Sequence, residues 1–298
     1  MSNCTASNIE FKLRIGTTFA VLSIVVNACS SIVACVLNFL IILTFVKTPS
    51  MRTPSYILIL CLAIADFGVG AVVQPVYCAE LFAKMKGYES VTCTTSYIRI
   101  CSSWVLGASS LLTITAITID RFLVLHLHLR YQELVTAKRS YTAAIVIAIL
   151  SIFGILPGLF YVAAMIAGCC FSVLFLLNIV LMAKISREVS KHSANIHSQE
   201  QAVRESLNLP RYKKTVNTVH YIMGTFSACY IPVPIVASLI VANSKVPESS
   251  LDAAFILTST LWLINSALNP VIYFWRIQDM RNAAVQLFRN IRCLHYEP

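Results

Sequence analysis

The chain has 298 residues, of which 57% are hydrophobic and only 12% are charged. A soluble globular domain carries roughly 25% charged residues, so this composition is that of a membrane protein. The net charge of +10 would suit a nucleic-acid partner, but the basic residues gather on one side of the predicted membrane segments, and we expect no such partner. Residues 1–14 lack the apolar core of a signal peptide, so the first apolar segment is expected to act as the targeting signal.

Seven segments are apolar over the roughly 20 residues that a helix needs to cross a bilayer. In chain order they are 17–46, 54–78, 94–125, 141–160, 163–183, 215–242 and 252–275. The pattern predicts an all-α membrane protein with a seven-transmembrane helix bundle over 17–275. Residues 276–298 are predicted to form an amphipathic helix and a cytoplasmic tail, because apolar residues recur there at helical spacing (Ile277, Met280, Ala284, Leu287 and Phe288).

The basic residues predict which end of the bundle faces the cytoplasm. With residues 1–16 as an extracellular N-terminus, seventeen Lys and Arg residues lie inside and six lie outside (Lys12, Arg14, Lys84, Lys86, Arg99 and Lys245). This asymmetry follows the positive-inside rule and predicts a multi-pass plasma-membrane protein whose inner face contacts anionic membrane lipids. Asn3, in Asn3-Cys4-Thr5, is then a candidate for glycosylation, and Cys293 is one for palmitoylation.

Several polar side chains lie at membrane depth, where they need partners. Asp66 stands in the middle of the second segment, and a carboxylate there costs roughly 2.5–3.5 kcal/mol on insertion scales. Candidate partners are Asn38, Ser110, Asn265, Ser266 and Asn269. Their oxygens suit a small hard cation such as Na+ or a water molecule. The alternative is a structural polar network that ties the helices together.

Two further features lie in the third and sixth segments. Asp120-Arg121 ends the third segment, where it is either a functional pair or an ion pair at the membrane interface. Pro232 is predicted to kink the sixth segment, because it removes a backbone hydrogen bond and clashes with the preceding turn. The aromatic residues beside it are either core packing or a hinge.

These residues together resemble the rhodopsin-like (class A) G-protein-coupled receptors, across nearly the whole chain. Asn269-Pro270-x-x-Tyr273 is the family motif intact, and Asp120-Arg121-Phe122 matches Asp-Arg-Tyr with Phe for Tyr. The other matches are Asn38, Leu62-Ala63-x-x-Asp66, and Phe226-x-x-Cys229-Tyr230-x-Pro232, in which Tyr230 replaces the usual Trp. Two loop segments look like the adenosine, melanocortin and lysophospholipid receptor group.

The resemblance implies roles for these residues. Asp66, Ser110, Asn265, Ser266 and Asn269 would form a sodium pocket for an allosteric Na+, and Asn38 would serve helix packing. The activation switch would comprise Asp120, Arg121, Phe226, Cys229, Tyr230, Pro232, Pro270 and Tyr273. A heterotrimeric G protein, arrestin and receptor kinases are the implied partners. Tyr212 stands where many relatives have a Glu that pairs with the Arg, so we expect raised ligand-independent signalling.

The sequence excludes some classes of extracellular ligand more clearly than it identifies one. Ser103 replaces the Asp of amine receptors, and Leu263 replaces the Lys that binds retinal. Arg99 occupies the position at which lysophospholipid receptors bind phosphate, which favours a lipid-like or anionic ligand; the alternative is a snorkelling Arg at the helix end. The candidate ligand residues are Arg99, Ser103, Trp104 and Trp262.

The outer loop between the fourth and fifth segments is predicted to be unusually short. Two crossings between Arg139 and Lys184 leave about four residues for it, either as a natural short loop or through loss of a segment. The family's outer disulfide position is Ser96. Cys93 is nearby, and its possible partners are left open (Cys78, Cys101, Cys169 and Cys170).

Other function classes have less support in the sequence. No internal repeat or paired half-helix suggests a transporter, and no nucleophile–base pair or metal-ligand cluster suggests an enzyme. A non-signalling or decoy receptor is the main alternative. The retained Asp120-Arg121 and Tyr273 argue against it.

Overall fold

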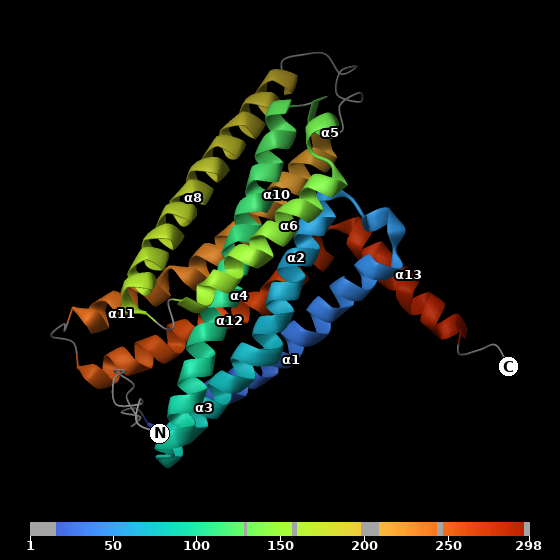
Figure 1. Cartoon of the computed structure of the whole chain (residues 1–298). Coiled ribbons are helices and arrows are strands. Elements are labelled where there is room, and N and C mark those ends of the chain that lie inside the picture. Colours follow the sequence, from blue (N-terminus) through green and yellow to red (C-terminus); the bar gives the residue numbers. More distant parts are fainter. Residues whose placement is uncertain (1–15, 128–129, 157–159, 198–208, 243–246, 295–298) are drawn as a thin grey trace.

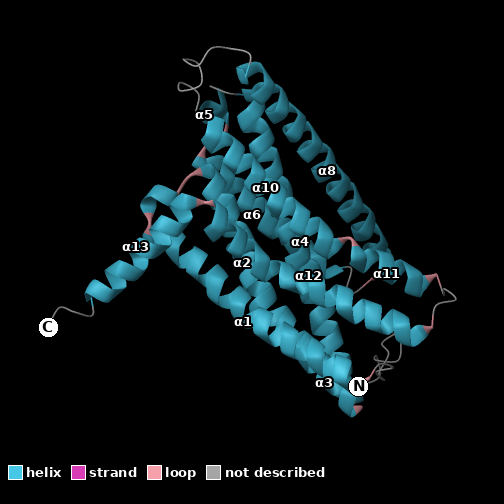
Figure 2. Ribbon diagram, turned by 180° about the vertical axis from the view of Figure 1, so that it is seen from behind, coloured by secondary structure: helices cyan, strands magenta, loops and turns pink. Residues whose placement is uncertain are grey.

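The computed structural model describes residues 16–127, 130–156, 160–197, 209–242 and 247–294. All regular secondary structure in these ranges is helical, and seven of the spans are long and apolar enough to cross a membrane. Figure 1 shows these spans gathered into one bundle, and Figure 2 shows the same arrangement from behind. The predicted all-α, seven-helix fold is confirmed.

The helices follow the predicted order, with bounds that differ mostly at their ends. The first three spans are α1 (Thr17–Lys47), α2 with α3 (Pro54–Gly68 and Gln74–Lys86), and α4 (Glu89–Leu127). The fourth and fifth are α6 (Ala137–Ile152) with the 3₁₀ turn η5 (Phe153–Ile155), and α8 (Tyr161–His197). The sixth and seventh are α10 with α11 (Leu209–Tyr230 and Pro232–Val241) and α12 (Glu248–Arg276). Short helices η2 (Pro49–Met51) and α5 (Tyr131–Leu134) lie in the connections.

A final helix, α13 (Gln278–Leu294), leaves the inner end of the bundle at an angle (Figure 1). Met280 and Ala284 are buried against the bundle, whereas Val285 and Phe288 are exposed. The helix therefore presents an apolar surface beyond the bundle, as an amphipathic helix at a membrane surface does. This is the predicted C-terminal amphipathic helix.

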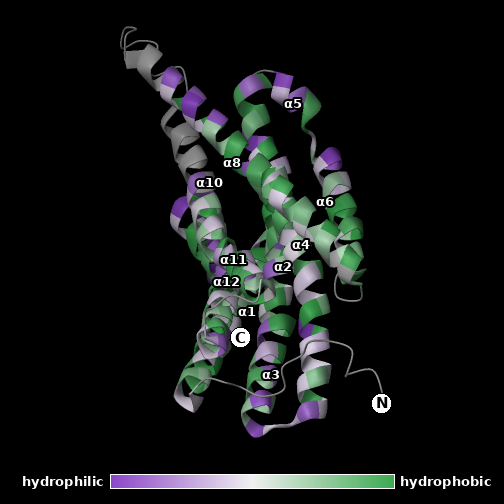
Figure 3. Ribbon diagram, turned by 90° about the vertical axis from the view of Figure 1, so that its left-hand side faces the viewer, coloured by the Kyte–Doolittle hydropathy of each residue, from purple (hydrophilic) through white to green (hydrophobic). Residues whose placement is uncertain are grey.

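Apolar side chains cover the outside of the spans as well as their core. Figure 3 shows hydrophobic residues along the outward faces of α6 and much of α8, with hydrophilic residues gathered toward the helix ends. Val173 and Leu176 of α8 are largely exposed, as lipid-facing residues are. The buried core is built around Leu62, Leu111 and Phe226.

The second span extends farther outward than predicted. The predicted segment ended at residue 78, but α3 continues to Lys86 and ends at Gly87, whose φ of 72° terminates the helix. The helix continues because the charge of Glu80 is compensated by Arg99 and Lys84. A π-helical turn, η3 (Val69–Val73), joins α2 to α3 just before Pro75.

Proline has different effects in the sixth and seventh spans. The sixth span breaks at Ile231, between the end of α10 and the start of α11 at Pro232, as predicted. Pro270 lies inside α12 without interrupting it. Ile231 keeps helical dihedral angles (φ −58°, ψ −40°), so the change at Pro232 is local and consists of the missing backbone donor.

η5 ends at Ile155 and α8 begins at Tyr161, and the predicted short outer connection falls mostly on residues 157–159, which lie outside the described residues. Gly154, just before it, packs directly against the backbone of α4. A Cβ at this position would lie 2.9 Å from the carbonyl oxygen of Trp104, closer than real Cβ contacts. The close approach of the fourth span to α4 thus requires glycine here.

Gly154→Ala is expected to lower the stability of the protein by about 1–3 kcal/mol, because the methyl group has no room and the backbone must shift. The measurement is thermal unfolding in detergent. Gly224→Ala in α10 is the matched control, since nothing lies within 4 Å of its Cβ position. An equal melting temperature for the Gly154 variant and the control would contradict the prediction.

Candidate functional site

The polar residues at membrane depth meet between α1, α2 and α12. The Asn269 amide Nδ2 donates to Asp66 Oδ2 over 2.8 Å, and Asp66 is only 1% exposed. Asn38 Nδ2 donates to the backbone carbonyl oxygen of Ser266 over 3.0 Å, which ties α1 to α12. Of the predicted partners, the structure thus brings Asn269 into contact with Asp66, and it joins Asn38 to the backbone of Ser266.

Three oxygen atoms in this region have unused hydrogen-bonding capacity. Oδ1 of Asp66, Asn265 and Asn269 are buried and have no hydrogen-bonding partner among the described residues. Ser110 and Ser266, also predicted for this site, are buried as well. Buried acceptors normally find a donor, a water molecule or an ion, and carboxylate, amide and hydroxyl oxygens are hard ligands. The oxygen atoms of these residues are therefore of the chemical type that would bind the predicted Na+.

Asp120, at the inner end of α4, is held by three neighbours. Tyr131 donates its hydroxyl to Oδ1 over 2.6 Å, Ser55 Oγ donates to Oδ2 over 3.0 Å, and Arg121 Nη2 lies 3.1 Å from Oδ2. Burial raises the pKa of Tyr131, and the hydrogen bond to Asp120 adds to the rise, so the hydroxyl stays protonated and donates. The sequence did not indicate Tyr131 or Ser55 as partners.

Contacts from α8 and α12 hold the inner half of α10. Ser186 Oγ contacts Nε2 of His220, and the guanidinium of Arg276 lies 5.1 Å from the ring centroid of Tyr221. Tyr212 lies in α10, but its side chain is outside the described residues. Contacts other than the usual Arg–Glu pair thus connect α10 to its neighbours.

Three aromatic rings, those of Trp262, Tyr230 and Phe226, form an aromatic stack and contact one another in series toward the buried core. The ring of Tyr230 lies 6.0 Å from that of Trp262 in a T-shaped arrangement and stacks on Phe226 at 3.8 Å. Phe226 belongs to the same buried cluster as Tyr273, whose hydroxyl has no partner among the described residues. Cys229 is buried beside the stack, and Pro232 follows it.

A cavity of about 700 Å³ lies beside this stack, between α3, α4, α8, α10, α11 and α12. All four candidate ligand residues, Arg99, Ser103, Trp104 and Trp262, line it, and so do Phe226 and Tyr230. The lining is mostly apolar and aromatic with a few polar groups, as in sites for small organic ligands. A ligand in the cavity would therefore touch the aromatic stack directly.

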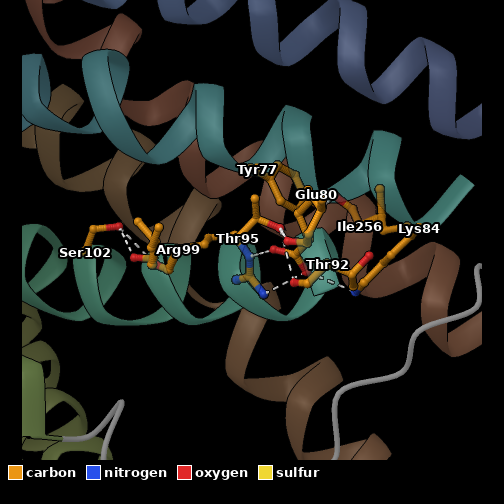
Figure 4. Close-up of polar contacts among 10 residues, drawn as sticks. Tyr77, Glu80, Lys84, Thr92, Thr95, Arg99, Ser102 and Ile256 are labelled. Atoms are coloured by element: carbon orange, nitrogen blue, oxygen red, sulfur yellow. Dashed lines mark hydrogen bonds and ion pairs between the residues drawn. The ribbon is translucent and has the colours of Figure 1, made fainter. Parts of the chain in front are cut away.

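Arg99 has a partner that the sequence did not suggest. Figure 4 shows it beside Glu80 of α3; Arg99 Nε lies 2.5 Å from Glu80 Oε2, and Lys84 Nζ lies 3.0 Å from Oε1. Glu80 is 1% exposed. The alternative of an Arg that simply snorkels to water is therefore wrong, because its guanidinium is engaged with a buried carboxylate.

Comparison with known proteins identifies the family. The family model described as 7 transmembrane receptor (rhodopsin family) matches residues 37–167 and 160–273. This chain belongs to that receptor family. The two matched segments overlap at the start of α8, beside the short outer connection. The predicted membership is thus confirmed; it is a family of receptors rather than enzymes and implies a G protein as a partner.

Several curated receptors are similar to this one. G-protein coupled receptor 12 of Mus musculus is 28% identical over 279 residues, which cover 87% of this chain and 79% of the relative. The receptor of the same name from Homo sapiens is 28% identical over 280 residues, with the same coverage, and that from Rattus norvegicus is 27% identical over 279 residues. The likeness to the adenosine, melanocortin and lysophospholipid group stays a prediction.

Cys93, near the start of α4, forms a disulfide bond, but its partner is none of the cysteines suggested from the sequence. Cys93 is disulfide-bonded, whereas Cys78, Cys101, Cys169 and Cys170 are free. All four suggested pairings are therefore wrong. Two predicted modification sites are not tested: Asn3 lies outside the described residues, and Cys293 lies in α13 with its side chain outside them.

Proposed function

We propose that this receptor binds an amphiphilic ligand in the cavity and activates a heterotrimeric G protein at its inner end. The observation that carries the proposal is the aromatic path from the cavity to the core. Trp262 and Tyr230 line the cavity, Tyr230 stacks on Phe226, and Phe226 packs in the cluster that contains Tyr273. Ligand contacts at one end of such a path bias which arrangement of the helices is stable at the other.

The remaining parts of the switch have roles in this proposal. Arg121 contacts the G protein once α10 moves outward about the break at Pro232, and Na+ held by Asp66 stabilises the inactive arrangement. The receptor lies in the plasma membrane with its N-terminus extracellular, so that the cavity faces outward and α5 and α13 face the cytoplasm. Arrestin and receptor kinases bind the same inner surface after activation.

Ligand-independent activity is expected to be high in this receptor. The Glu that locks the Arg in many relatives is replaced by Tyr212. Among the described side chains of α10, His220 makes a polar contact with Ser186, and Tyr221 makes a cation–π contact with Arg276. An exposed cation–π contact contributes only about 0.5–1 kcal/mol, so the active arrangement is populated without a ligand.

The test is nucleotide exchange on purified G proteins by membranes that contain the receptor but no added ligand. We expect exchange several-fold above that of mock membranes for at least one G-protein class. Surface-expressed receptor with exchange no higher than mock, both alone and across a screen of amphiphilic ligands, would instead support a non-signalling decoy receptor.

A further inference from the structure

Three charged residues form a cluster at the outer end of the cavity, which we call the Glu80 cluster: Glu80 and Lys84 of α3, and Arg99 of α4. Arg99 Nε lies 2.5 Å from Glu80 Oε2 and its Nη2 lies 3.4 Å from Oε1, while Lys84 Nζ lies 3.0 Å from Oε1. Of the three residues, Arg99 alone lines the cavity. The charge of Arg99 that a ligand would meet is therefore compensated in part by Glu80, whose single negative charge is shared with Lys84.

The geometry of this pair limits what Arg99 can bind. A guanidinium recognises phosphate or carboxylate by presenting two parallel N–H groups along one edge. The edge formed by Nε and Nη2 is turned to the two oxygens of Glu80. The guanidinium also lies over the ring of Tyr77, 5.6 Å from its centroid. Glu80 thus occupies the edge formed by Nε and Nη2, and a ligand meets only the remaining N–H groups of Nη1 and Nη2.

Burial of Glu80 also acts against an anionic ligand. Its side chain is only 2% exposed, so water screens its charge poorly. An anionic head group at Arg99 would lie close to this carboxylate, and the repulsion between the two like charges would offset part of its attraction to the guanidinium. An uncharged head group meets no such repulsion.

The rest of the cavity supplies a hydroxyl and a large apolar surface. Ser103 lies one helical turn inward from Arg99 on α4 and lines the cavity, and its buried Oγ has no partner among the described residues. Most of the remaining lining is aromatic or aliphatic, including Trp104, Phe171 and Phe255. The cavity therefore offers two polar contacts near its outer end and room for an apolar chain.

We propose that Glu80 determines the ligand specificity of this cavity, which takes a lipid with an uncharged, hydrogen-bonding ester or amide head group rather than a phosphate or carboxylate. The head group accepts from Arg99 and bonds with Ser103, and the acyl chain lies among the aromatic residues toward Trp262. This inference rests on the proposed function only in taking the cavity as the ligand site.

The experiment compares two fluorescent probes with the same acyl chain, a monoacylglycerol and a lysophosphatidate. Equilibrium binding is measured on the full-length receptor in lipid nanodiscs, without a G protein. The wild-type receptor is expected to bind the glycerol probe about tenfold or more tightly than the phosphate probe, since like-charge juxtaposition opposes the latter. Glu80→Gln is expected to shift this ratio by about tenfold or more toward the phosphate probe, because it frees the edge of Arg99.

Two further variants separate specificity from a general loss of structure. Lys84→Gln removes a charge from the same cluster but from outside the cavity lining, and is expected to change the ratio by less than about threefold, because a more exposed charge is better screened. Glu80→Gln with Arg99→Gln replaces the ion pair by two amides, and should bind the glycerol probe without gaining affinity for the phosphate probe.

The wild-type ratio tests the proposal even where Glu80→Gln does not fold. Equal or tighter binding of the phosphate probe by the wild-type receptor would overturn it. So would a ratio that Glu80→Gln leaves unchanged in folded receptor. Failure of the wild-type receptor to bind either probe would also overturn it, while nucleotide exchange on G proteins would show that the receptor function itself stands.

Discussion

Replacing Asp120 with asparagine is expected to raise ligand-independent nucleotide exchange about tenfold. Asp120 accepts hydrogen bonds from Tyr131 and Ser55 and pairs with Arg121. Asparagine removes the charge that makes these contacts strong, and hydrogen bonds to charged groups contribute about 1.5–3 kcal/mol. Loss of even about 1.4 kcal/mol from the inactive arrangement shifts the equilibrium tenfold. Arg121 is then released to contact the G protein.

The measurement is nucleotide exchange at matched surface expression. Tyr131→Phe is the graded control, because it removes one of the three contacts and leaves the charge of Asp120 in place. It should raise exchange by a smaller factor. Exchange that falls in the Asp120 variant, or stays at the wild-type value, would show that the Asp120–Arg121 pair does not restrain this receptor.

Replacing Asp66 with asparagine is expected to abolish the effect of sodium on signalling. In the wild-type receptor, exchange of NaCl for choline chloride should raise ligand-independent activity about fivefold or more, the low end of allosteric coupling. The ion needs the negative charge of Asp66 together with the unpartnered oxygens of Asn265 and Asn269. Without the carboxylate, these neutral oxygens hold Na+ too weakly to affect the equilibrium.

The control for this experiment is Asn27→Ser, which alters a different buried polar contact. Asn27 is fully buried in α1 and donates to Thr260 Oγ1 over 2.9 Å. This variant should keep the response to sodium even if its stability falls. A sodium response of wild-type size in the Asp66 variant would show that the ion acts elsewhere.

The predictions from sequence were most accurate at residues whose own chemistry is energetically unfavourable where they lie, such as a polar side chain in a bilayer or a proline in a helix. Asp66, Asn38 and Asn269 are polar groups in a bilayer, so each had to have a partner, and the structure brings Asn269 to Asp66 and Asn38 to the seventh span. Pro232 lacks a backbone donor, and α10 ends just before it. Such inferences need no knowledge of how the helices pack, because the physical constraint is local.

The sequence failed where two distant residues compensate one another. The predicted second segment ended at residue 78, before Glu80, yet α3 continues through Glu80, which pairs with Arg99 on the next span. Tyr131 gave no signal as a partner of Asp120, since a tyrosine in a short connection is common. The disulfide of Cys93 excludes every pairing suggested from position along the chain, because proximity in space depends on how the segments fold together.

The π-helical turn at Val69–Val73 determines which side chains reach the outer cavity. Its wider turn accommodates one more residue than an α-helix would, and one residue corresponds to a rotation of about 100°. If the same residues formed a regular α-helical turn instead, all of α3 would be turned about its axis, and Ala79 would stand where Glu80 now faces Arg99. The ion pair would be lost although both of its residues were still present. The length of this one turn thus matters as much to ligand recognition as the identity of any residue in the cavity.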